Sequence, residues 1–104
     1  MRERDAPFTM RIEGGEGAVT IVADGELDRS TAPSIAAALE QHRGEDIVID
    51  LSAVGFADSS MVRTLVEERH HAHLDDRRFA IKGASDRVRR SFELSGVEGL
   101  FDWV

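Results

Sequence analysis

The sequence predicts a single α/β domain with a mixed, mostly parallel β-sheet, an N-terminal antiparallel hairpin and α-helices packed on the sheet. The length of 104 residues suits one domain, and a hydrophobic fraction of 41% is enough for one core. Two strand-like stretches near the N-terminus are separated by a glycine-rich turn. After them, helical apolar patterns alternate with short apolar runs, which is typical of a parallel sheet. The predicted domain spans residues 1–104, with a core from about residue 8 to residue 104.

The hairpin is predicted from two short strands. Apolar and polar residues alternate from Phe8 to Glu13, which is the period of a half-buried strand. The run Gly14-Gly15-Glu16-Gly17 forms a tight turn, and Ala18–Ala23 is the returning strand. Gly25 is predicted to end this second strand.

A helix and a buried strand follow the hairpin. Ser30 or Thr31 is predicted to cap the helix, Pro33 is tolerated in its first turn, and Gly44 ends it. Its buried face is predicted to consist of Ala32, Ile35, Ala36 and Leu39. The continuous apolar run Ile47–Leu51 contains a single acid, which favours a strand that is covered on both faces.

The second half repeats the alternation of helix and strand. A helix is predicted from the segment Asp58-Ser59-Ser60 to about Leu74, followed by a turn at Asp75-Asp76 and a short strand at Phe79–Ile81. Its apolar stripe consists of Val62, Leu65 and Val66.

A third helix and a last strand complete the predicted fold. The helix begins at Ser85 or Asp86 and ends at Gly96. Its predicted inner face consists of Val88, Phe92 and Ser95, with Leu94 beside it. Residues Phe101–Val104 are predicted to form a final edge strand.

The composition excludes several classes of protein. Thirteen Lys and Arg residues against 20 Asp and Glu residues give a net charge of −7, which argues against binding to nucleic acid or an anionic membrane. The absence of cysteine excludes thiol catalysis and disulfides. The charged N-terminus has no apolar signal region, and no apolar run is long enough to cross a bilayer. We therefore expect a soluble cytoplasmic protein, monomeric or weakly dimeric.

The segment Phe56-Ala57-Asp58-Ser59-Ser60 has two interpretations. Asp58, Ser59 and Ser60 can each cap the helix that follows, which contributes about 1 kcal/mol. Alternatively, Ser59 is a phosphorylation site, because a phosphate there would add a charge of about −1.5 to −2 near a helix N-terminus. Helix caps are much commoner than modification sites, so the residue chemistry alone favours a cap.

Two separated motifs resemble the STAS domain of bacterial anti-sigma-factor antagonists. The first is GELDRSTAPSI, residues 25–35, and the second is DLSAVGFADSS, residues 50–60. The C-terminal stretch SFELSGVEGLFDWV, residues 91–104, is similar to the late helix and last strand of the family. The resemblance covers roughly Phe8 to Val104.

The resemblance implies a phosphorylation switch. It implies that Ser59, with Ser60 as the secondary candidate, is phosphorylated by an anti-sigma factor that is also a serine kinase. The unphosphorylated antagonist would bind that anti-sigma factor and release the sigma factor, and a phosphatase would reset the switch. ATP and Mg²⁺ would belong to the kinase, so this chain itself needs no cofactor. Asp28 matches a family position next to the surface of the phosphorylation site, and Asp58 matches the acid that precedes the phosphorylated serine.

The chain departs from the family pattern directly after the two serines. The family usually continues with Gly-Leu-Gly, where this chain has Met61, Val62 and Arg63. Glycine allows a close approach of another backbone, so bulkier Met61 and Arg63 are predicted to change how a partner is recognised. The predicted partner-binding set is therefore Asp28, Asp58, Ser59, Ser60, Met61 and Arg63.

A second functional hypothesis is a constitutive interaction subunit. STAS-like domains also occur in lipid-transport ABC complexes and stress-signalling scaffolds, where the serine would serve only as a cap. A metal site is not predicted, because His70, His71 and His73 lack the spacing of a zinc-binding helix. No residue pattern predicts an enzyme active site.

Overall fold

The structure is a computed structural model that describes residues 8–15 and 17–104. Its sheet has the strand order β1-β2-β3-β4-β5, in which β1 is antiparallel to β2 and all other neighbours are parallel. This arrangement confirms the predicted mixed, mostly parallel sheet with an N-terminal hairpin. The predicted turn includes Glu16, which lies outside the described residues. The elements in chain order are β1 (Thr9–Gly15), β2 (Ala18–Leu27), α1 (Ala32–Gln41), β3 (Asp46–Ala57), α2 (Ser59–Leu74), β4 (Phe79–Lys82), α3 (Asp86–Leu94), a 3₁₀ turn (Glu98–Leu100) and β5 (Asp102–Trp103).

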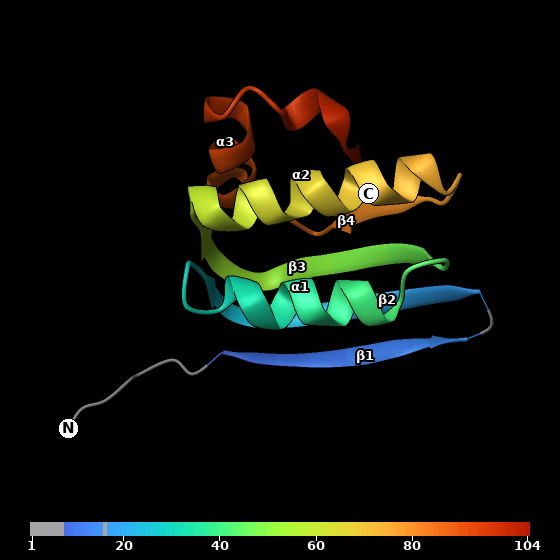
Figure 1. Cartoon of the computed structure of the whole chain (residues 1–104). Coiled ribbons are helices and arrows are strands. Elements are labelled where there is room, and N and C mark those ends of the chain that lie inside the picture. Colours follow the sequence, from blue (N-terminus) through green and yellow to red (C-terminus); the bar gives the residue numbers. More distant parts are fainter. Residues whose placement is uncertain (1–7, 16) are drawn as a thin grey trace.

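The three helices in the described part of the chain pack on the same face of the sheet. Each crossover joins neighbouring parallel strands and proceeds in one direction across the sheet, so right-handed connections place every helix on one side. Figure 1 shows α1 and α2 side by side in front of the strands. The helices and the inner strand residues belong to one hydrophobic cluster, which includes Ile21, Ile49, Ile35, Leu65 and Phe92.

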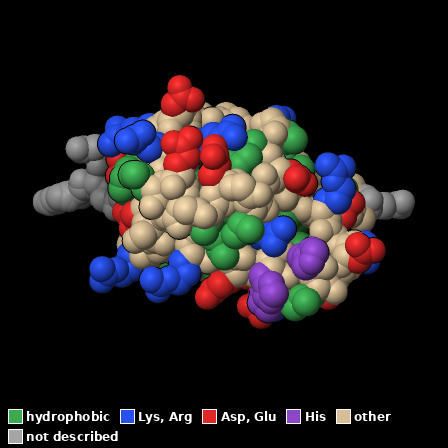
Figure 2. Space-filling view, turned by 90° about the horizontal axis from the view of Figure 1, so that it is seen from above, with side chains coloured by type: hydrophobic (Ala, Val, Ile, Leu, Met, Phe, Trp, Pro, Cys, Tyr) green, Lys and Arg blue, Asp and Glu red, His purple; other side chains and the backbone are tan. Residues whose placement is uncertain are grey.

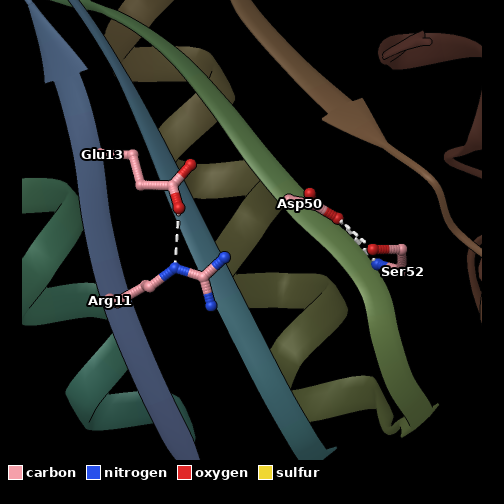
Figure 3. Close-up of polar contacts among 4 residues, drawn as sticks. All are labelled: Arg11, Glu13, Asp50 and Ser52. Atoms are coloured by element: carbon pink, nitrogen blue, oxygen red, sulfur yellow. Dashed lines mark hydrogen bonds and ion pairs between the residues drawn. The ribbon is translucent and has the colours of Figure 1, made fainter.

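The opposite face of the sheet is not covered by the described helices. In β3, Ile47, Ile49 and Leu51 are buried, whereas Val48 and Asp50 are only half-buried. The prediction that this strand is covered on both faces is therefore wrong. A continuous apolar run also arises when half-buried valines occupy the open face of a central strand. The view in Figure 3 is from this open face, with helices behind the sheet.

β2 and β3 are longer than predicted. Gly25 does not end β2, because it pairs with Val54 and the strand continues to Leu27. Gly25 has a φ of 122°, which glycine tolerates, and the register shifts between Gly25 and Glu26. β2 therefore continues through a local irregularity at Gly25 instead of ending there. As a result, β2 extends nearly to α1 and β3 extends nearly to α2.

The helix boundaries agree with the sequence more closely than the predicted inner faces do. In α1, Ala38 is buried where Ala36 was expected, and Ala36 is half-buried. In α3, the predicted inner residue Ser95 is exposed, because the helix ends at Leu94. Gly96 follows with a φ of 74° and donates its backbone N–H to Glu93, as expected for a glycine after a helix.

An aromatic cluster holds the C-terminal strand against α3. Phe92 is fully buried and contacts Phe101 and Trp103 edge-on, with ring centroids 5.2 and 5.1 Å away. The indole Nε1 of Trp103 donates a hydrogen bond to the carbonyl oxygen of Glu98 at 2.9 Å, and the Arg89 guanidinium lies 4.6 Å from the Trp103 ring centroid. These contacts explain how a strand of two residues remains in the sheet.

Candidate functional site

The two sequence motifs lie side by side at the ends of β2 and β3. The backbone N–H of Asp58 donates to the carbonyl oxygen of Leu27 at 2.9 Å. One carboxylate oxygen of Asp58 accepts from the N–H of Met61 at 3.1 Å, and the other accepts from the N–H of Arg29 at 3.2 Å. A single carboxylate therefore caps α2 and connects the loop before α1 to the start of α2.

Asp28 organises the loop between β2 and α1. Its Oδ1 accepts from the Ser30 hydroxyl at 2.7 Å, the Ser30 N–H at 2.9 Å and the Thr31 N–H at 3.2 Å. The Thr31 hydroxyl in turn donates to the carbonyl oxygen of Glu26 at 3.1 Å. Asp28 thus stabilises the loop through one carboxylate oxygen, and its predicted part in partner binding stays a prediction.

Ser59 is the first residue of α2 and is exposed. Its hydroxyl takes part in none of the side-chain hydrogen bonds found across residues 8–15 and 17–104. The cap of α2 is Asp58, so the hydroxyl of Ser59 is not used to stabilise the helix. Ser60 is half-buried, which makes it less accessible than Ser59.

Two shallow hollows of different character flank the two serines. The first, of about 320 Å³, is lined by Ser60 together with Arg29 and Arg63. The second, of about 270 Å³, is lined by Ser59 together with Phe56 and Leu94. Figure 2 shows several basic side chains gathered at its left end, which is the end of the molecule where α2 begins. A partner that covers this surface would meet Arg29 and Arg63 on one side of Ser59, and on the other side an apolar hollow with Arg87 beside Phe56.

The position of Met61 differs from the prediction. Its side chain is fully buried in the core cluster, so the prediction that it faces a partner is wrong. The third residue of a helix can point inward or outward, and here the inward direction is set by the packing of α2 on the sheet. Arg63 is exposed. Of the two bulky residues Met61 and Arg63, it is therefore Arg63 that changes the surface beside the serines.

Sequence reasoning missed two apolar residues beside Ser59. Leu94 is 75% exposed and Phe56 is 36% exposed, although both are large and hydrophobic. The Arg87 guanidinium carbon lies 5.8 Å from the centroid of the Phe56 ring. The sequence offered only a weak signal, which is that Leu94 falls outside the helical spacing of Val88 and Phe92.

The hydrogen bonds of the Asp28 carboxylate should make the free energy of unfolding depend on pH. The hydrogen bond from the Ser30 hydroxyl lowers the pKa of Asp28 below its usual 3.8, against the opposing effect of burial. A carboxyl with a lowered folded-state pKa stabilises the fold above pH 3.8, and this contribution is lost as the pH falls below that value. We therefore expect Asp28→Asn to lose less stability on acidification than the wild type, measured by urea unfolding between about pH 6 and pH 3.

The matched control for this measurement is Asp24→Asn. Asp24 is exposed, and its carboxylate accepts none of the side-chain hydrogen bonds recorded for the described chain. This control should follow the wild-type pH profile. Parallel profiles for Asp28→Asn and the wild type would contradict the role of the Asp28 carboxylate.

The described residues offer no group of three or more His, Asp or Glu side chains placed to hold a metal ion. Within the same residues, no helix is both long enough and apolar enough to cross a bilayer.

Comparisons with known proteins agree with the two motifs. The family model described as "Mlab, STAS domain" matches residues 10–102. The anti-sigma-B factor antagonist of Staphylococcus aureus strain NCTC 8325 is 33% identical over 79 residues, which are 73% of this chain and 73% of the relative. The anti-sigma-B factor antagonist of Listeria monocytogenes is 32% identical over 87 residues, covering 81% of this chain and 76% of the relative.

Solved structures show the same fold. An anti-sigma factor antagonist from Mycobacterium paratuberculosis matches with a TM-score of 0.81 and 26% identity, covering 93% of this chain and 85% of that one. Unphosphorylated SpoIIAA matches with a TM-score of 0.79 and 22% identity, covering 92% and 88% of the two chains, and supports the fold alone. The chain therefore belongs to the STAS-domain family, in which its curated relatives are anti-sigma-factor antagonists.

Proposed function

We propose that this chain is an anti-sigma-factor antagonist that acts by binding and is switched by phosphorylation of Ser59. In its unphosphorylated form it binds an anti-sigma factor that is also a serine kinase, and the sigma factor is released. The kinase supplies ATP and Mg²⁺, a phosphatase resets the switch, and the antagonist itself catalyses no reaction. The proposal places these events in the cytoplasm.

The observation that carries this proposal is the division of roles between Asp58 and Ser59. Asp58 caps α2, so the exposed Ser59 hydroxyl remains available to a kinase. The helix start is retained after modification, because the Asp58 cap does not depend on Ser59. A serine that serves only as a cap would accept a hydrogen bond from the first turn, and Ser59 does not.

The charge of the phosphate explains why phosphorylation would weaken partner binding. A phosphate on Ser59 adds a charge of about −1.5 to −2 next to the Asp58 carboxylate. The phosphate would stand at the lip of the apolar hollow that contains Phe56 and Leu94. Burying that charge against a partner without a matching cation is costly, so the phosphorylated form is released.

The test is affinity capture with two forms of the protein as bait. Ser59→Ala mimics the unphosphorylated form and is expected to retain an ATPase-type anti-sigma factor from a lysate of the native cell. Ser59→Asp places a charge at the same position and is expected to capture at least about tenfold less of it, because like or unpaired charges at an interface are unfavourable. Captured proteins are identified by mass spectrometry.

Two further baits separate the site from a general charge effect. Ser34→Asp adds the same charge at an exposed serine in the first turn of α1 and should bind like the wild type. Ser60→Asp tests the secondary phosphorylation site. Incubation of the purified pair with ATP and Mg²⁺ should place the phosphate on Ser59. Equal capture of one membrane-transport or scaffold subunit by Ser59→Ala and Ser59→Asp would instead establish a constitutive STAS subunit.

A further inference from the structure

The first strand forms one edge of the sheet. β1 is the terminal strand in the order, and among residues 8–15 and 17–104 it pairs only with β2, through all seven of its residues from Thr9 to Gly15. Figure 1 shows it at the border of the sheet, away from α2 and α3. The strand contains no proline, so its outer backbone groups can accept another strand. Edge strands of this length are templates for pairing with a second chain.

The side chains of β1 have a distinctive order. Arg11 and Glu13 lie on the open face of the sheet, where Arg11 Nε and Glu13 Oε2 are 2.7 Å apart (Figure 3). Ile12 points to the other face and is 43% exposed. The strand therefore carries a cation and an anion on one face, placed symmetrically about an exposed isoleucine on the other.

This order makes β1 complementary to itself in one antiparallel register. Residues that face each other in an antiparallel pair lie on the same face of the sheet. A two-fold axis at Ile12 places Arg11 opposite Glu13 of the second copy, twice, and Ile12 opposite Ile12. An axis at Arg11 or at Glu13 would instead place like charges opposite each other. Charge therefore selects the register centred on Ile12.

We propose that two copies of this chain associate through antiparallel pairing of their β1 strands, centred on Ile12. The sheet continues across the two copies, and the helices of both lie on the same side. Residues Gly14 and Gly15 face Met10 and Thr9 of the second copy, so no bulky side chains meet at the ends of the paired segment. Pairing through one strand buries less than the roughly 1,200–2,000 Å² typical of a stable complex, so the dimer is weak.

The test reverses the charge at Arg11 and at Glu13. Analytical ultracentrifugation measures the molar mass at protein concentrations up to about 1 mM, which detects dissociation constants in the micromolar to millimolar range. Wild type is expected to dimerise with rising concentration. Arg11→Glu gives two acids and Glu13→Arg gives two bases on this face, so each alone should dimerise at least about tenfold more weakly. Both side chains are exposed, so both variants should fold, which circular dichroism checks.

Two combinations make the test specific. An equimolar mixture of Arg11→Glu and Glu13→Arg should form a heterodimer, because every facing pair is again of opposite charge. The double variant Arg11→Glu/Glu13→Arg exchanges the two charges and should restore wild-type dimerisation. Lys82→Glu, a charge reversal at an exposed residue on β4, should leave the dimer unchanged.

Three results would overturn the proposal. They are a wild type that stays monomeric up to about 1 mM, a dimer that the Arg11→Glu change does not weaken, or single variants that associate alone as well as in their mixture. The first result would mean that the charges of β1 protect an edge against association. None of these results bears on Ser59, so the proposed switch is judged separately.

Discussion

The Phe92→Ala variant is expected to lose about 3–5 kcal/mol of its free energy of unfolding. Phe92 is fully buried, and its ring joins α3 to Phe101 and Trp103. Alanine removes both edge-to-face contacts and leaves a cavity between α3 and the C-terminal residues Phe101 and Trp103. Because small domains have total stabilities of about 5–15 kcal/mol, this single change should leave the fold close to its limit.

The matched control for this variant is Phe56→Ala. Phe56 is also a phenylalanine, but it is 36% exposed at the end of β3, so its truncation should cost about 1–2 kcal/mol, clearly less than that of Phe92. Urea unfolding followed by far-ultraviolet circular dichroism measures both values. A loss below about 1 kcal/mol for Phe92→Ala would show that the aromatic cluster does not hold the C-terminal strand.

The order of elements was predictable because local patterns determine it. Alternation in β1, the helical stripe of α2 and the glycine after α3 are properties of a few neighbouring residues. The open sheet face was not predictable from Ile47–Leu51, because Val48 has the same hydropathy whether a helix covers it or not. The continuation of β2 through Gly25 depends on its pairing with Val54, which is 29 positions away in the chain. Long-range pairing overrode the local signal of a strand end.

The site was predictable in its chemistry and less so in its surface. The sequence identified Asp58 as a competent cap, and its second bond to the N–H of Arg29 appears only once β2 and β3 are placed in register. Met61 was assigned to the surface because bulk alone does not give the direction of a side chain. Leu94 was placed only beside the inner face of α3, because periodicity in a helix of nine residues does not separate the edge of the core from a binding surface.

We expect Leu94→Asp to weaken binding of the partner captured by Ser59→Ala about 10- to 100-fold, while the free energy of unfolding falls by less than about 1 kcal/mol from the added charge at the end of α3. Leu94 is 75% exposed and lines the hollow beside Ser59, so it contributes little to the core. Hot-spot residues at the centre of an interface account for about 2 kcal/mol or more of binding, and the prediction assigns Leu94 to that class. An aspartate removes that contact and adds a charge on the same side of Ser59 as the phosphate would. Isothermal titration calorimetry measures the affinity, and urea unfolding measures the stability.

Leu74→Asp is the control that separates this surface from exposed hydrophobicity in general. Leu74 is 67% exposed and lies at the last position of α2, whereas Ser59 is the first residue of that helix. The Leu74→Asp variant should bind the partner as tightly as the wild type does. If Leu94→Asp also bound normally, the apolar hollow would not be part of the interface, and the effect of a charge at Ser59 would have to arise from the side that carries Arg29 and Arg63. The two leucines therefore decide on which side of Ser59 the partner lies.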